Sequence, residues 1–201
     1  MKTSFAKDCW DPQDWMLVKC PWGSSDGLWI QNEDCIINYT PENAAPEDLC
    51  EGGKCAADTF ASMILKKRFN SPAKAASTML FDYKMAPLIF VTNEIDTSVK
   101  VPLLGARYEI VLYHKGINIW EHFQQDGKLA YNRKLFYRKT FLAKQKYRME
   151  VAVNPNEKSI TAALGESCFT VHTPLLSDSY YIGIMGCEGV NRFYDFEVTN
   201  L

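Results

Sequence analysis

One predicted β-hairpin gathers residues that can do chemistry on one face. The stretch ARYEIVLYHKGINIWEHF, residues 106–123, alternates apolar and polar residues on both sides of Lys115-Gly116. If Lys115-Gly116 is a two-residue turn, Glu109 lies opposite His122, and alternate side chains share a face. That face then carries six residues: Glu109, Val111, Tyr113, Asn118, Trp120 and His122.

A carboxylate, an imidazole, an amide and two large aromatic rings are not what a solvated sheet face needs. The polar groups supply hydrogen-bond donors and acceptors, and the rings offer flat apolar surfaces such as the C–H side of a sugar prefers. Both kinds of group on one surface are typical of a small-molecule site. The alternative is that Trp120 and Tyr113 pack under a loop and that His122 only pairs with Glu109.

Two modes of action follow from this face. In an enzyme, a hydrolase or a lyase, Glu109 and His122 would be the catalytic groups and Tyr113 would assist. In a non-catalytic binding protein, Trp120 would be the stacking platform and Asn118 would contact hydroxyl groups. The sequence leaves this choice open, because catalysis requires two titratable groups that converge on one bond.

The connection Cys187-Glu-Gly-Val-Asn-Arg192 near the C-terminus is a second candidate. We expect it to lie at the rim of the site, with Glu188, Asn191 and Arg192 contacting the ligand. Arg192 suits a uronate carboxylate through a bidentate pair. The alternative is that Glu188 and Arg192 pair across the turn and only hold it.

Other catalytic motifs are incomplete. Glu94-x-Asp96 is similar to part of the Glu-x-Asp-x-x-Glu motif of retaining β-glucanases, but Val99 stands where the second Glu is needed. YHKGINIW is similar to a Tyr-x-Lys-x-Gly stretch of jelly-roll polysaccharide lyases, in which Tyr113, His122 and Arg192 would serve β-elimination. No Ser stands at the strand-to-helix elbow that a serine triad needs, and the chain lacks phosphate-binding glycine loops.

The elements that position these residues are short strands between turn residues, and helical periodicity is scarce. We therefore predict an all-β fold, a two-sheet antiparallel β-sandwich that forms a single domain over residues 1–201. Pro72–Ser77 is the best helical candidate but is too short to matter, and Phe193–Thr199 is the expected last strand. Thr40–Asp58 is long for a connection, so a lid or rim over the site and a mobile loop both stay open.

The composition of the chain indicates which classes of partner to expect. A net charge of −2 gives no reason to expect nucleic acid, and apolar residues interrupt the basic stretch Arg133–Arg148. No apolar run reaches the length of a membrane helix or an export signal, so we expect no membrane partner. Seven cysteines cannot all pair, which favours reduced thiols and a cytoplasmic location. Cys50 and Cys55 would close a small loop only if a leader had been lost.

The chain resembles the concanavalin A-like lectin/glucanase superfamily of jelly rolls. DPQDWMLVKCPWGSSDGLWIQNEDCII is similar to its Asp-x-x-x-Trp and Gly-x-Trp opening, and STMLFDYKMAPLIFV with YEIVLYHKGINIWEH resembles its paired concave strands. YYIGIMGCEGVNRFYDFEV resembles its final hairpin. The resemblance is greatest to an uncharacterised bacterial branch associated with pectin and rhamnogalacturonan utilisation.

The resemblance implies a plant-polysaccharide oligosaccharide as ligand, and Arg192 points to one that contains uronic acid. It implies no catalysis. Structural calcium is frequent in the superfamily, with Asp11, Asp14 and Asp195 as candidates, but their spacing has no calcium signature, so we predict no cofactor or metal. A homodimer that buries the hairpin face is a third alternative.

Overall fold

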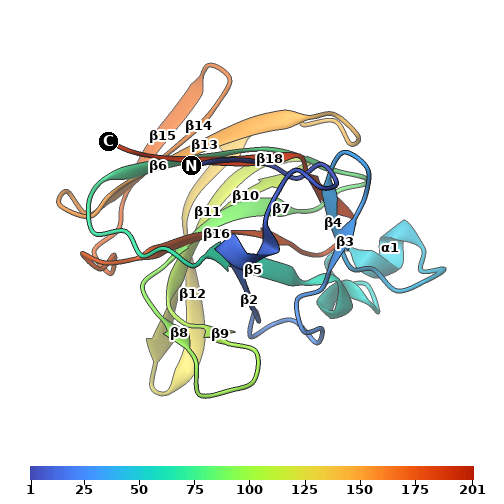
Figure 1. Ribbon diagram of the computed structural model, residues 1–201, viewed down its shortest axis with the longest axis horizontal. Coiled ribbons are helices and arrows are strands. Elements are labelled where there is room, and N and C mark those ends of the chain that lie inside the picture. The colour runs from blue at the N-terminus through green and yellow to red at the C-terminus, as the bar shows by residue number, and fades with distance from the viewer.

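Two large antiparallel sheets face each other in the computed structural model, which describes residues 1–201 (Figure 1). The prediction of an all-β two-sheet sandwich is confirmed. Each sheet buries one face against the other, and the alternation along the strands decides which side chains lie between them.

The nine-stranded sheet runs in the order β15-β14-β13-β6-β17-β4-β3, with β18 paired to both β6 and β1. Its strands are β1 (Lys2–Ser4), β3 (Trp29–Gln31), β4 (Ile36–Asn38), β6 (Ala73–Phe81), β13 (Tyr147–Asn154), β14 (Ser159–Leu164), β15 (Ser167–His172), β17 (Asn191–Phe193) and β18 (Asp195–Asn200). Because β1 pairs with β18, the first and last strands lie together, as the resemblance implies (Figure 1).

The seven-stranded sheet runs in the order β12-β11-β10-β7-β16-β5-β2. Its strands are β2 (Trp15–Val18), β5 (Ala61–Leu65), β7 (Pro87–Thr92), β10 (Arg107–Tyr113), β11 (Gly116–Gln125), β12 (Lys128–Arg138) and β16 (Tyr181–Gly186). A small separate hairpin is formed by β8 (Ile95–Asp96) and β9 (Leu103–Leu104).

Helical structure is limited to three short elements. They are the helix α1 (Pro46–Leu49) and two 3₁₀ turns, Pro12–Asp14 and Ala56–Thr59. No helix has the length and apolar character that crossing a membrane requires.

Two predicted elements differ from the structure. The helical candidate Pro72–Ser77 is wrong, because Ala73–Ser77 belong to β6, which pairs with β13 on one side and with β17 and β18 on the other. The expected last strand, Phe193–Thr199, is split into β17 and β18. The split occurs at Tyr194, whose N–H donates to the carbonyl of Thr78 instead of continuing the ladder.

Apolar residues form two clusters, one on each side of the seven-stranded sheet. Thirty-two buried residues fill the space between the sheets, among them Ile110, Leu112 and Ile119 of the predicted core face. A second cluster of 10 buried residues lies on the outer face of the seven-stranded sheet and includes Phe90, Leu104 and Met185. Loops therefore cover part of that outer face, and the uncovered part holds the candidate site.

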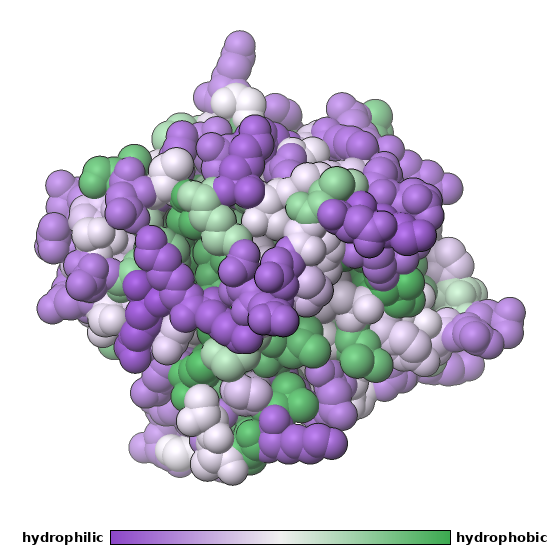
Figure 2. Space-filling view, viewed as in Figure 1, coloured by the Kyte–Doolittle hydropathy of each residue, from purple (hydrophilic) through white to green (hydrophobic).

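The two edge strands β2 and β3 leave apolar surface exposed. Figure 2 shows apolar side chains between polar ones over the region of β2 and β3, and Leu17, Leu28 and Ile30 are exposed there. A groove of about 430 Å³ lies between these edges and is lined by Trp10, Trp15 and Trp29. Three of the five tryptophans thus lie away from the hairpin face.

Candidate functional site

The hairpin of β10 and β11 presents the predicted face, although its register differs from the prediction. The turn is His114-Lys115, Tyr113 pairs with Gly116, and Glu109 pairs with Trp120 rather than with His122. The predicted pairing is therefore displaced by two residues. Because side chains alternate with a period of two, an even displacement leaves each residue on its predicted face.

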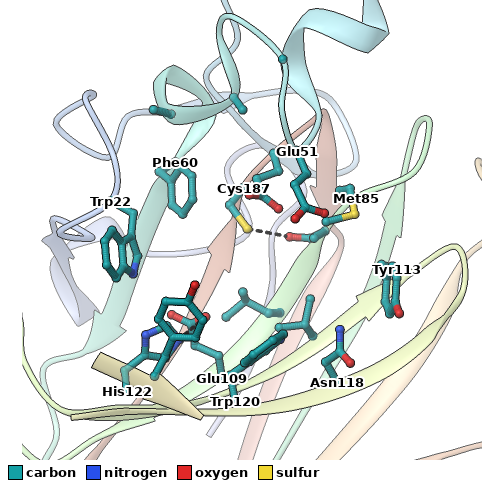
Figure 3. Close-up of a pocket in the computed structure, with 18 of the residues that line it drawn as sticks. Trp22, Glu51, Phe60, Met85, Glu109, Tyr113, Asn118, Trp120, His122 and Cys187 are labelled. Carbon is teal, nitrogen blue, oxygen red and sulfur yellow. Dashed lines mark hydrogen bonds and ion pairs between the residues drawn. The ribbon is translucent and has the colours of Figure 1, made fainter. Parts of the chain in front are cut away.

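A pocket of about 540 Å³ lies over this face. Its floor is formed by all six predicted hairpin residues, and Figure 3 shows Tyr113, Asn118, Trp120 and His122 in a row along the strands. The remaining walls come from five other segments. They contribute Trp22, Glu51, Gly53, Lys54, Ala56, Ala57, Phe60, Met85, Ala86, Leu88, Tyr131, Cys187 and Glu188. The volume lies within the range of small-molecule sites.

The segment Thr40–Asp58 forms one wall. Glu51, Gly53 and Lys54 line the pocket after α1, and Ala56 and Ala57 line it within the second 3₁₀ turn. The rim interpretation of this segment therefore agrees with the structure.

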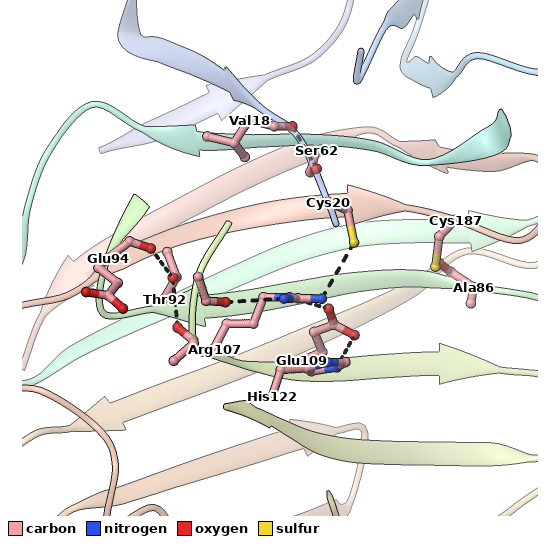
Figure 4. A network of polar contacts seen from close by, with 12 residues as sticks. Val18, Cys20, Ser62, Ala86, Thr92, Glu94, Arg107, Glu109, His122 and Cys187 are labelled. Carbon is pink, nitrogen blue, oxygen red and sulfur yellow. Dashed lines mark hydrogen bonds and ion pairs between the residues drawn. The ribbon is translucent and has the colours of Figure 1, made fainter. Parts of the chain in front are cut away.

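Glu109 is a buried carboxylate held by the side chains of Arg107 and His122 (Figure 4). Arg107 Nε donates to Glu109 Oε1 at 2.6 Å, and His122 Nε2 lies 3.1 Å from Glu109 Oε2. Burial alone would raise the pKa of Glu109, but Arg107 and then His122 outweigh it and lower that pKa to about 2. Glu109 is thus ionised at neutral pH and accepts a proton poorly, so the predicted pairing with His122 exists but includes Arg107 as the stronger partner.

Two polar groups of the floor have no hydrogen-bond partner within the protein. Asn118 Oδ1 and His122 Nδ1 are buried without a hydrogen bond, whereas His122 Nε2 faces Glu109 Oε2; Asn118 is 9% and His122 7% exposed. Buried polar atoms are rarely left unsatisfied, since each costs about 1–3 kcal/mol. Both residues line the pocket, so a ligand with hydroxyl groups would satisfy them.

Glu188 lies at the pocket rim, as predicted, with a left-handed backbone (φ 51°). Burial, followed by repulsion from Glu51 and Glu109, raises the pKa of Glu188 to about 7. The pocket therefore contains one carboxylate that is ionised and one that is half protonated near neutral pH.

Glu188→Gln should reveal this shift as a change in pH-dependent stability. Because the folded-state pKa lies above the ordinary 4.5, Glu188 favours folding below pH 4.5 and loses that contribution as the pH rises to about 7. We expect the Gln variant to be more stable than the native protein at pH 8, by about 1–3 kcal/mol, and equally stable at pH 4. Urea unfolding at both pH values measures this, and equal stabilities at pH 8 would contradict the raised pKa.

Asn191 does not reach the pocket, contrary to the prediction. Its side chain is fully buried, and Nδ2 donates to the carbonyls of Cys187 at 2.9 Å and Gly189 at 3.2 Å. Its backbone N–H donates to Asn38 Oδ1 at 2.8 Å. Asn191 therefore holds the turn together.

Arg192 is also placed away from the pocket. It lies on β17 in the other sheet and makes a bidentate pair with Asp82. The distances are 2.9 Å from Nε to Oδ1 and 2.7 Å from Nη2 to Oδ2. The predicted bidentate geometry is present, but its partner is a carboxylate of the protein. Neither the uronate role of Arg192 nor its alternative pairing with Glu188 agrees with the structure.

Four functional residues were not predicted from the sequence. Arg107 stands two residues before Glu109 and so shares its face, a signal that the alternation contains. Trp22, Phe60 and Tyr131 come from loops or from β12, and their position over the pocket depends on packing between distant segments. No local pattern in the sequence indicates it.

The other candidate motifs lie elsewhere. Asp96 is exposed on β8 and outside the pocket lining. Asp11 accepts a hydrogen bond from the N–H of Gln13 and so caps the 3₁₀ turn Pro12–Asp14, and Asp195 pairs with Arg148. No group of three or more His, Cys, Asp or Glu side chains is arranged to hold a metal ion. All seven cysteines are unpaired, so Cys50 and Cys55 do not close a loop.

No protein-family model matches this chain, and no curated protein is similar to it in sequence. Solved structures do resemble its fold. The carbohydrate binding module CBM66 from Bacillus subtilis has a TM-score of 0.62 at 12% identity, covering 93% of this chain and 96% of that one. A glycoside hydrolase family 16 endo-glucanase from Bacteroides ovatus has a TM-score of 0.61 at 10% identity, covering 99% of both chains.

The alginate lyase AlgAT5 of polysaccharide lyase family 7 has a TM-score of 0.53 at 10% identity, covering 95% of this chain and 96% of that one. Likeness at such identity is evidence of fold, so the pectin-associated branch stays a prediction. The chain has the concanavalin A-like jelly-roll fold, in which the candidate pocket occupies the outer face of the seven-stranded sheet.

Proposed function

We propose that this protein binds a carbohydrate in the pocket over β10 and β11. The observation that carries the proposal is the juxtaposition of aromatic rings with unsatisfied polar atoms in one cavity. Trp120, Tyr113 and Phe60 offer apolar faces, while Asn118 Oδ1 and His122 Nδ1 lack partners that sugar hydroxyls would provide. The fold adds support, since the similar structures include a carbohydrate binding module, a glycoside hydrolase and a polysaccharide lyase.

The charge of the pocket bears on the kind of sugar. Glu51, Glu109 and Glu188 line it, against Lys54 and His122 as groups able to carry positive charge. Because Arg192 is engaged by Asp82, the cation expected to bind a uronate is absent from the cavity. We therefore propose that the sugar unit inside the pocket is neutral. A plant-polysaccharide origin and uronic-acid units further along the ligand stay predictions from the sequence.

A binding panel tests the proposal. Oligosaccharides from xylan, cellulose, β-1,4-galactan and homogalacturonan would be titrated into the protein by calorimetry, and the mixtures then analysed by mass spectrometry. We expect binding of at least one neutral oligosaccharide. If only homogalacturonan fragments bind, the neutral-sugar proposal fails, and if no carbohydrate binds, the proposed function fails.

Glycoside hydrolysis is a second candidate, favoured by the opposite pKa shifts of two carboxylates in the pocket. Glu188, half protonated near pH 7, would give its proton to the glycosidic oxygen, while ionised Glu109 stabilises the positive charge that develops on the sugar. The oxygen of a water molecule then bonds to the sugar carbon, and the proton that this water releases returns to Glu188. A lyase would instead leave an unsaturated end without added water, but its uronate-neutralising residue Arg192 lies outside the pocket.

Hydrolysis predicts that the fragments together gain one water, and that turnover falls as the pH rises through about 7, where Glu188 loses its proton. Glu188→Gln should abolish turnover and retain binding. Turnover that persists in this variant would remove Glu188 from the mechanism. If the panel is unchanged and binding is retained, a lectin-like protein that binds without cleaving is the better interpretation.

A further inference from the structure

One end of the pocket is closed by aromatic side chains from two distant segments. Trp22, in the loop after β2, meets Tyr131 of β12 with ring centroids 6.2 Å apart in a T-shaped contact. Tyr131 also lies 6.0 Å from the ring of His122 and 5.7 Å from that of Trp120. Figure 3 shows Trp22 and His122 at the same end of the cavity and Tyr113 at the other. The two exposed rings thus join the loop to β12 across the His122 end.

Beyond this closure, the protein's own chain covers the outer face of the sheet. The N–H of Lys19 donates to the Pro102 carbonyl at 2.7 Å, and the N–H of Leu104 donates back to Lys19 at 2.9 Å. Leu104 is buried with Phe90 in the apolar cluster of the outer face. Arg107, at this end of β10, donates to the Gly105 carbonyl at 3.2 Å. No continuous groove therefore runs along β10 past Arg107.

The remaining side wall is fixed by contacts between two loops. The N–H of Ser24 donates to the Ala57 carbonyl at 2.9 Å, and the hydroxyl groups of Ser24 and Ser25 contact Asp58 and the Phe60 carbonyl. These contacts tie the loop of Trp22 to the wall formed by residues 51–60. Tyr113, at the other end, is half-buried, and the lining residues Glu51 and Lys54 are exposed.

We infer that the pocket is blind and receives the end of a carbohydrate chain: the covered half of the sheet blocks the way out along β10, and the Trp22–Tyr131 contact blocks the remaining way out between the loop and β12. This inference rests on the proposed function and specifies it further. The terminal sugar lies between Trp120 and the wall of residues 51–60, next to Asn118 and His122. The rest of the chain leaves past Tyr113.

The stoichiometry of binding to polymers tests this inference. Calorimetry would compare a tetrasaccharide, a hexasaccharide and the intact polymer of xylan, β-1,4-galactan and cellulose, the last in a soluble derivative. End recognition predicts one protein per chain at every length. It also predicts a dissociation constant per chain end that changes less than about twofold from tetrasaccharide to polymer.

The double variant Trp22→Ala with Tyr131→Ala opens the closed end. Both side chains are largely exposed, 43% and 58%, so the variant should remain folded, which unfolding in urea would verify. We expect several molecules of this variant to bind each polymer chain. Trp10→Ala, at the edge groove, is the matched control and should keep one per chain.

The outcomes are distinguishable. If the native protein binds polymers in proportion to their length, carbohydrate binding stands and end recognition fails. End recognition also fails if the folded double variant still binds one per chain. If none of these sugars or the homogalacturonan fragments binds, the proposed function itself fails.

Discussion

Replacing Arg107 with Leu is expected to destabilise the folded protein by about 3–5 kcal/mol. The Arg107 side chain is fully buried and forms the 2.6 Å ion pair that keeps Glu109 ionised. Without it, Glu109 is a buried charge that keeps only its contact with His122. Urea unfolding at pH 7, followed by tryptophan fluorescence, measures the loss.

Arg148→Leu is the matched control, since Arg148 pairs with Asp195 and Glu197 at the surface. Exposed ion pairs contribute about 0–1 kcal/mol, so this change should cost little. Adding Glu109→Gln to Arg107→Leu should restore part of the lost stability, because the unpaired charge is then removed. If Arg107→Leu costs no more than the control, Arg107 does not hold the floor of the pocket.

Replacing Trp120 with Ala is expected to weaken carbohydrate binding by about 10–100-fold, equivalent to about 1.4–2.7 kcal/mol. Trp120 forms the centre of the floor, and its half-buried ring is backed by Arg133 at 5.6 Å and Tyr131 at 5.7 Å. Because one side of the ring faces the cavity, truncation removes a ligand contact and little of the core. Calorimetry with the best-binding oligosaccharide of the panel measures the loss.

Arg192→Leu is the comparison variant for Trp120→Ala in the same binding measurement. The sequence predicted this residue as a ligand contact, whereas the structure pairs it with Asp82, so binding should change less than about twofold. If Arg192→Leu weakens binding as much as Trp120→Ala, the placement of Arg192 away from the ligand is wrong. If Trp120→Ala unfolds the protein instead, Trp120 is a core residue and the site assignment fails.

The alternation of residues was enough to predict the floor of the pocket from the sequence. Because the displacement of the hairpin register by two residues preserves the faces, Glu109, Asn118 and His122 lie together even though their partners differ. Alternation also implied that Arg107 shares this face. Its pairing with Glu109 could not be predicted in the same way, because it depends on which charged side chains lie close together in the folded protein.

The C-terminal connection shows the limit of local reasoning. Between Gly186 and Asn191 the chain leaves the seven-stranded sheet and enters the nine-stranded one, so Glu188 and Arg192, four residues apart, face different surroundings. No periodic pattern indicates such a crossing. The first half of the strand Ala73–Phe81 offered only a weak helical candidate, because small residues have weak local preferences, and pairing with β13, β17 and β18 decides their structure.

The most direct test of carbohydrate binding in this pocket is a ¹H–¹⁵N spectrum of the protein labelled at its tryptophan indoles. Trp22 and Trp120 line the pocket, and Trp10, Trp15 and Trp29 line the edge groove, so the five indole signals separate the two places. Titration with the neutral oligosaccharides of the panel should shift the signals of Trp22 and Trp120 and leave the other three unchanged. Shifts confined to Trp10, Trp15 and Trp29, or none with any sugar, would contradict the assignment.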